Sequence, residues 1–239
     1  MEIHETINKW FADTEKKIVS LKASDKIALL CASVTAVVKT YINSILAQLD
    51  MGFVLPSVAG LRIVSDLVNK FLWCLNEDND DKIKDRIKRW EKSTAKENKK
   101  LLEGFIKIID DSQVKSAMQE TIAELDHVVA NNRIKEMPPA TRLFEENKNL
   151  FFDNVYPQAY QQFNAGVHID IDILEKIWTL QNQTGKWVGD IQLSPKDIAG
   201  LKKHCLSSVW MVLKMLYRYY YWDVAEIDDE YKNVKRFAG

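Results

Sequence analysis

The spacing of apolar residues predicts helices along most of the chain. Near the N-terminus, apolar or part-apolar residues recur at three- and four-residue steps, at Ile3, Ile7, Trp10, Thr14, Ile18 and Leu21. This repeat is that of one face of an α-helix, so an amphipathic helix is predicted over residues 1–22. A second helix is predicted from the N-cap chemistry of Ser24 and Asp25 to about Leu49.

The segment from Pro56 to Leu75 is expected to be the most deeply buried helix. Apolar residues occupy almost every position with a long side chain, except for Arg62, Asp66 and Lys70 at successive four-residue steps. Residues four apart share a helix face, so these three charges form one stripe. Because a buried charge costs several kcal/mol unless it is paired, the stripe requires a partner, a cleft or an exposed edge.

The second half of the chain continues the helical pattern. After an acidic string at residues 77–81, a long polar helix is predicted with a narrow apolar seam: Ile83, Ile87, Trp90, Thr94, Leu101, Phe105 and Ile108. A fifth helix is predicted over Val114–Val129, shorter helices within residues 140–163 and at 173–182, and a last long helix from the N-cap Ser194 to about Trp222.

Together these segments predict an all-α protein, a helical bundle of about six to eight helices with long core helices. The predicted organisation is an N-terminal amphipathic helix (1–22), a bundle domain (23–222) and a polar C-terminal tail (223–239) that frays. We expect Trp73 and Trp210 in the core and His204 at the surface or the core edge.

The composition of the chain favours a cytoplasmic location and argues against a membrane span, a metal site and a strongly charged nucleic-acid-binding surface. The chain has 239 residues, with 33 basic and 34 acidic side chains and a formal net charge of −1, so no global field favours nucleic acid or an anionic membrane. Three cysteines, Cys31, Cys74 and Cys205, lie in apolar stretches, as expected of buried thiols in a reducing cytoplasm. Polar residues interrupt the most apolar run, 27–49, and this predicts no membrane span. No cofactor or metal motif is found.

Two short stretches resemble a family of uncharacterised helical bacterial proteins. They are LRIVSD at residues 61–66 and YQQFNAGVH at residues 160–168, which match an Arg-x-x-x-acid helix followed later by an Asn-x-x-x-His turn, within a likeness spanning residues 25–222. A wider resemblance is to the HEPN superfamily of helical ribonucleases and of phage-defence or toxin modules. Asn164 and His168 match the second half of the HEPN motif, while Phe163 stands where that motif has its arginine.

The HEPN resemblance implies a stress- or defence-associated module that acts on RNA or nucleotides as a degenerate ribonuclease. Its candidate catalytic residues are Arg62, Asp66, Asn164 and His168, with Arg62 reaching the site from its own helix. His168 would act as a base near neutral pH, Arg62 would bind phosphate through its guanidinium fork, and Asp66 would orient either group.

Other interpretations stay open beside this one. Arg62 and Asp66 can be a structural ion pair that anchors the 164–168 turn, in a non-catalytic scaffold that forms a homodimer or binds a protein partner. Residues 80–100 carry nine basic and five acidic side chains, and this face can contact phosphates or be merely solvated. The aromatic run at residues 217–222 can stack bases or belong to the core or a dimer contact. A small-molecule pocket between helices is the last alternative.

Overall fold

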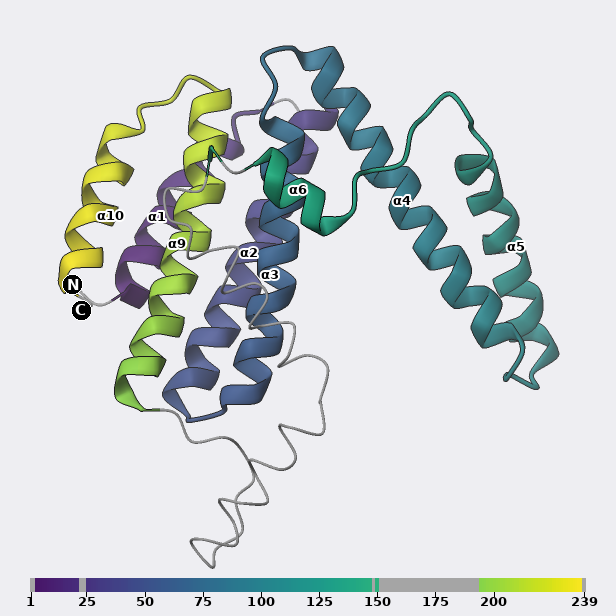
Figure 1. Ribbon diagram of the computed structural model, residues 1–239, viewed down its shortest axis with the longest axis horizontal. Helices are drawn as coiled ribbons and strands as arrows, with labels where there is room; N and C mark the ends of the chain where they lie inside the picture. Colours follow the sequence, from purple (N-terminus) through teal and green to yellow (C-terminus); the bar gives the residue numbers. More distant parts are fainter. Residues whose placement is uncertain (1–2, 22–24, 148, 151–193, 238–239) are drawn as a thin grey trace, which may run out of the picture. The chain divides into compact units, whose positions relative to one another are not determined.

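The described part of the chain is entirely helical. A computed structural model describes residues 3–21, 25–147, 149–150 and 194–237, and these form eight α-helices and no strand (Figure 1). The prediction of an all-α helical bundle is therefore confirmed. The predicted short helix at 173–182 lies outside the described residues.

The contacts divide the chain into two compact units. The first unit comprises residues 1–75 and 144–239, and the second comprises residues 76–143. The second boundary falls within α6 (Ala140–Glu146). Each unit is built from helices that pack on one another within it.

The first unit is assembled around α9 (Pro195–Tyr219), which packs against four other helices. These are α1 (Ile3–Ile18), α2 (Lys26–Asp50), α3 (Val54–Leu75) and α10 (Ala225–Phe237). Ser194 and Asp197 start α9 with a capping box, as the sequence predicted, since each side chain bonds the other residue's backbone N–H. From His204 to Tyr217 every residue except Ser207 and Lys214 is buried. Helix α9 is thus buried around most of its circumference over this stretch.

The crossing of α2 and α3 leaves no room for a side chain at Gly60. A Cβ atom built on Gly60 would lie 2.8 Å from Cγ1 of Ile45, which is itself buried on α2. Two helix backbones can approach this closely only where one of them carries no side chain. Gly60 lies two residues before Arg62 on α3, so this crossing lies close to the start of the charged stripe.

Two polar contacts attach the end of α6 to α3. The buried amide of Asn147 donates from Nδ2 to the backbone oxygen of Asn69 at 2.9 Å and to its side-chain oxygen at 2.7 Å. The indole N–H of Trp73 donates to Glu146 at 2.7 Å. Buried polar groups must find partners to offset their desolvation, so these bonds fix how this segment meets α3. The burial of Trp73 agrees with the prediction.

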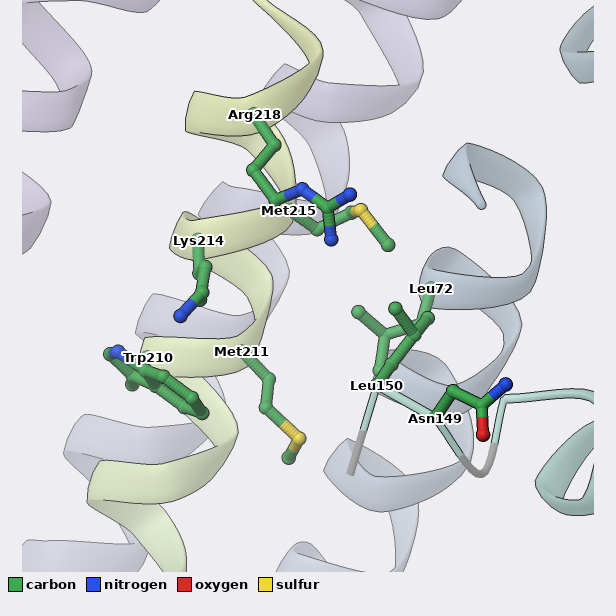
Figure 2. Close-up of a pocket in the computed structure, with 8 residues that line it drawn as sticks. All are labelled: Leu72, Asn149, Leu150, Trp210, Met211, Lys214, Met215 and Arg218. Atoms are coloured by element: carbon green, nitrogen blue, oxygen red, sulfur yellow. The ribbon is translucent and has the colours of Figure 1, made fainter. Parts of the chain in front are cut away.

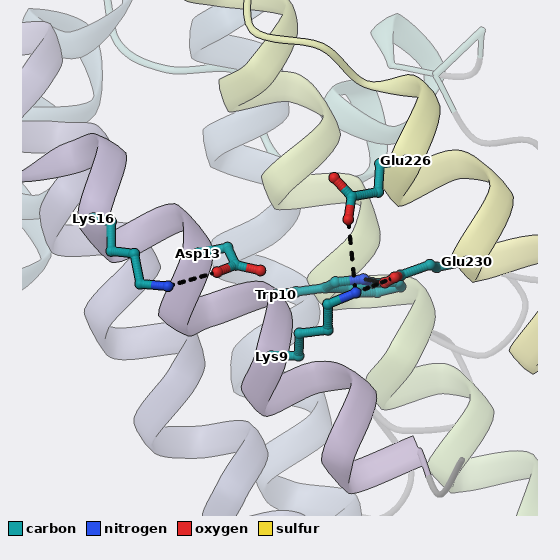
Figure 3. Close-up of polar contacts among 6 residues, drawn as sticks. All are labelled: Lys9, Trp10, Asp13, Lys16, Glu226 and Glu230. Carbon is teal, nitrogen blue, oxygen red and sulfur yellow. Dashed lines mark hydrogen bonds and ion pairs between the residues drawn. The ribbon is translucent and has the colours of Figure 1, made fainter.

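The C-terminal residues form a packed helix, so the prediction of a fraying tail is wrong. Helix α10 buries Ile227, Tyr231 and Val234, which recur at helical steps. It is also fastened to α1, because Glu230 accepts hydrogen bonds from Lys9 and, at 2.6 Å, from the Trp10 indole (Figure 3). Lys9 lies 3.6 Å from Glu226 as well. Three apolar residues at helical spacing are therefore enough to pack this segment as a helix, although most of its residues are polar.

The most apolar helix of the described chain is α2. It alone among the described helices is long and apolar enough to cross a membrane, a test that the core helix of a soluble bundle also passes. Its buried residues recur at helical spacing: Ile27, Ala28, Cys31, Val34, Thr35, Val38, Ile42, Ile45, Leu46 and Leu49. That stripe packs on α3, α9 and α1, as expected of a core helix.

The second unit is an antiparallel pair of helices, α4 (Asp80–Ile106) and α5 (Ser112–Val129), side by side in Figure 1. Lys99 of α4 forms an ion pair with Asp126 near the end of α5. Lys92 donates to the backbone oxygens of Asn131 and Ile134 at 2.9 and 2.8 Å. We call this pair of helices the hairpin.

We predict opposite outcomes for alanine at two helical glycines. Gly60→Ala should lower the free energy of unfolding by about 1–3 kcal/mol, because the new methyl group overpacks Ile45. The matched control is Gly200→Ala within α9, where no atom lies within 4 Å. It should raise stability by about 0.5–1 kcal/mol through helix propensity. Urea unfolding followed by circular dichroism measures both, and a Gly60→Ala protein as stable as Gly200→Ala would contradict the close crossing.

Candidate functional site

The three charges predicted on one face of α3 pair with one another at the edge of the first unit. Asp66 lies between the two cations, 3.7 Å from Arg62 and 2.7 Å from Lys70. The exposed fractions of the side chains are 21% for Arg62, 27% for Asp66 and 21% for Lys70. The free-energy cost of partly burying these charges is therefore reduced in two ways: the charges pair with one another, and each side chain stays partly exposed to water. We call these three residues the α3 triad.

The triad carries two cations for one carboxylate, so it has a formal charge of +1 at an edge that water reaches. Its two contacts differ, since Lys70 lies within hydrogen-bond distance of Asp66 whereas Arg62 lies beyond it. An arginine side chain is long and presents planar, bidentate donors. Lys70 is therefore the closer of the two cations that neutralise Asp66.

The other two predicted catalytic residues, Asn164 and His168, lie outside the described residues. The structure brings Arg62 and Asp66 together, as their spacing predicted, and a contact between them and residues 164–168 stays a prediction. Phe163 lies outside the described residues as well.

A buried serine–histidine contact lies next to the triad on α3. Ser65 Oγ is 3.3 Å from Nε2 of His204 on α9, and both residues are buried. Burial lowers the pKa of His204 to about 4, so this imidazole is neutral at physiological pH. The prediction that His204 lies at the surface or core edge is wrong, because α9 is covered on nearly all sides at this position.

The three cysteines are buried free thiols, as the sequence predicted. Burial raises the pKa of the Cys31 and Cys205 thiols to about 12. A thiol is nucleophilic only as the thiolate, so these two side chains have the properties of core residues.

A small pocket lies between α3, α9 and residues 149–150 of the first unit. Its cavity volume is about 50 Å³, and its lining residues are Leu72, Asn149, Leu150, Trp210, Met211, Lys214, Met215 and Arg218 (Figure 2). Lys214 forms an ion pair with Asp228 at 2.6 Å and lies 4.6 Å from the centre of the Trp210 ring. A volume of this size has room for a few water-sized groups, and one of its two cations is already paired.

The aromatic run after α9 is divided between core and surface. Tyr217 is buried and makes an edge-to-face contact with Trp222, whose ring stacks on Tyr220. Tyr221 is 96% exposed and adopts a positive φ of 55°. Trp210 is buried, as predicted. The core interpretation therefore holds for Tyr217, whereas Tyr219, Tyr220 and Trp222 are half-buried.

The hairpin has few buried residues and several exposed apolar side chains. In α5 no residue is buried, while α4 buries only Ile83, Ile87, Lys92 and Ala95. The exposed apolar residues of this unit are Leu101, Phe105, Ile108, Val114 and Val128. The apolar seam predicted on α4 thus exists, but only its first part is covered.

Among the described residues, no three His, Cys, Asp or Glu side chains are placed to hold a metal ion. No protein-family model, curated protein or solved structure matches the chain. The resemblance to HEPN proteins accordingly stays a prediction from the sequence.

His204 should make the stability of the first unit depend on pH. The unfolded chain binds a proton at His204 below pH 6.5, whereas the folded chain does so only near pH 4, so the free energy of unfolding falls as pH decreases through this window. One pKa unit is about 1.4 kcal/mol, so the loss attributable to His204 is about 3 kcal/mol.

Urea unfolding between pH 7 and pH 4 measures this effect. His204→Gln should remove that part of the pH dependence, while the control His127→Gln, at an exposed position on α5, should retain it. Equal pH profiles for His204→Gln and wild type would contradict a buried neutral imidazole.

Proposed function

We propose that the chain is a stress- or defence-associated module that acts on RNA or nucleotides through the α3 triad. The observation that supports this most directly is the excess positive charge of the triad at a water-accessible edge. The resemblance to HEPN proteins supplies the direction of the proposal, with a cytoplasmic bacterial setting and no membrane or cofactor.

In this proposal Arg62 binds a phosphate group and Lys70 holds Asp66. The guanidinium fork matches two phosphate oxygens. Movement of Arg62 would leave Asp66 with its closer partner, Lys70 at 2.7 Å, so the carboxylate would not face the phosphate as an uncompensated charge. His168 is proposed as the base and Asn164 as a hydrogen-bonding residue, both from the 164–168 turn.

A second candidate function is a helical scaffold that dimerises or binds a protein partner. The observation that favours it is the exposed apolar surface of the hairpin, including Leu101 at 59% and Phe105 at 48% exposure. In this alternative the α3 triad is a structural ion network, and its loss would lower stability alone.

Arg62→Ala should weaken RNA binding by the purified chain roughly 10- to 100-fold, the equivalent of one charge-assisted contact. Fluorescence anisotropy with short single-stranded RNA at a fixed salt concentration measures this affinity. Arg62→Lys should lie between wild type and Arg62→Ala, because it keeps the charge and loses the fork. Incubation with mixed RNA, with and without divalent metal, tests cleavage in parallel.

The matched control is Lys16→Ala, which removes an exposed cation from a local ion pair with Asp13 in the first unit. It should bind RNA as wild type does. Thermal unfolding of each variant separates loss of binding from loss of fold. Wild-type protein with no affinity for RNA or nucleotides, or Arg62→Ala with unchanged affinity, would overturn the proposal and favour the scaffold.

A further inference from the structure

The pocket between α3, α9 and residues 149–150 has an apolar interior. Aliphatic and thioether side chains form much of its wall: Leu72, Leu150, Met211 and Met215. Figure 2 shows Met211 and Met215 extending from α9 toward Leu72 and Leu150. A water molecule in such a site needs about two to four polar partners, and these four side chains carry no strong hydrogen-bond donor or acceptor. A hydrocarbon chain therefore suits this interior better than water does.

Arg218 supplies one positive charge at the rim of this pocket. Its side chain reaches past Met215 on the side of α9 that faces Leu72, whereas Lys214 extends to the other side of the helix (Figure 2). Lys214 pairs with Asp228 at 2.6 Å. The Arg218 guanidinium is exposed, and no ion pair or side-chain hydrogen bond joins it to another described residue. The pocket thus combines an apolar interior with a single cation that is available to a ligand.

The size of the pocket limits the ligand to a short chain. Its cavity volume is about 50 Å³, and one water-sized group needs about 10–15 Å³ on the same measure. About three to five such groups therefore fit inside. An alkyl chain of that length can enter the pocket, whereas a nucleobase, with its ring and exocyclic groups, is larger than this.

The charge at the rim matches a carboxylate better than a phosphate. A guanidinium binds both anions through paired N–H donors. A phosphate monoester carries a charge of about −1.5 to −2 at neutral pH, and it is held by several cations, polar side chains or backbone N–H groups. This pocket offers Arg218 as its one unpaired cation among the described residues. A carboxylate carries the single negative charge that one guanidinium balances.

We propose that this pocket binds a short-chain monocarboxylate. The carboxylate pairs with the Arg218 guanidinium, and the alkyl chain lies between Leu72, Met211 and Met215. Methionine side chains are flexible and adapt to apolar groups of irregular shape, so the pocket accepts linear and branched chains of this length. The proposal does not depend on the function proposed for the α3 triad.

Titration of the full-length chain with acetate, propionate and butyrate tests the proposal at constant ionic strength. The readout is NMR of isotope-labelled methyl groups of the six methionines. The signals of Met211 and Met215 should shift together, while the exposed Met51 serves as the internal control and stays unchanged. Affinity should rise about fourfold with each added methylene, the fold-change expected when one CH₂ group leaves water. Butyramide, which has a similar shape and no charge, should bind roughly tenfold more weakly than butyrate.

Substitution of the rim cation tests its role. Arg218→Gln should weaken butyrate binding roughly tenfold, the equivalent of one charge-assisted contact, and should abolish the preference for butyrate over butyramide. The matched control is Arg133→Gln, at an exposed position of the second unit, which should bind butyrate as wild type does. Arg62→Ala should also bind butyrate normally, so this proposal and the function proposed for the triad fail separately.

Four results would overturn the proposal. The first is that the Met211 and Met215 signals do not shift with butyrate at about 50 mM, well above the millimolar dissociation constants typical of so small a ligand. The second is equal affinity for acetate and butyrate, because the apolar interior would then be unused. The third is inorganic phosphate binding as tightly as butyrate with the same shifts, which would identify a non-specific anion contact. The fourth is unchanged butyrate affinity in Arg218→Gln.

Discussion

A carboxylate held between two cations on one face of α3 is the contact on which the proposed function depends. Charges that leave water need partners, and here the four-residue spacing supplies them within a single helix. Asp66 accepts Lys70 closely and Arg62 loosely. On this difference rests the proposal that Arg62, the more distant of the two cations, binds an anionic ligand.

The packing of the first unit determines where the triad lies. Gly60 lets α3 approach α2, and Ser65, the residue before Asp66, meets the neutral His204 of α9. The side of α3 that faces these helices is buried. The α3 triad lies on the remaining side, which is partly exposed to water. Stability of the core and the position of the charges are therefore set by the same helix.

Much of this fold could be predicted from the sequence, because its signals are local. Helices α2 and α9 begin at the N-caps Asp25 and Ser194, as the sequence predicted. The four-residue spacing of the charges on α3 likewise predicted their ion pairs. The burial of His204 was not predicted because it results from contacts between distant parts of the chain, such as the contact with Ser65, 139 residues away. Helix α10 was missed although Ile227, Tyr231 and Val234 carried a helical repeat. The seam on α4 was visible, but the side of α4 that receives α5 depends on contacts between helices, which no repeat within one helix reveals.

The two units divide the chemistry of the chain. The charged contacts on α3 belong to the first unit, and the hairpin leaves Leu101 and Phe105 exposed. The most direct test of the function proposed for the triad is the slope of RNA affinity against salt concentration on logarithmic axes. Each phosphate contact to a single strand contributes about 0.7 to this slope. We expect Arg62→Ala to reduce the slope by about that amount. An unchanged slope beside a weakened affinity would show that Arg62 acts through the fold and binds no phosphate.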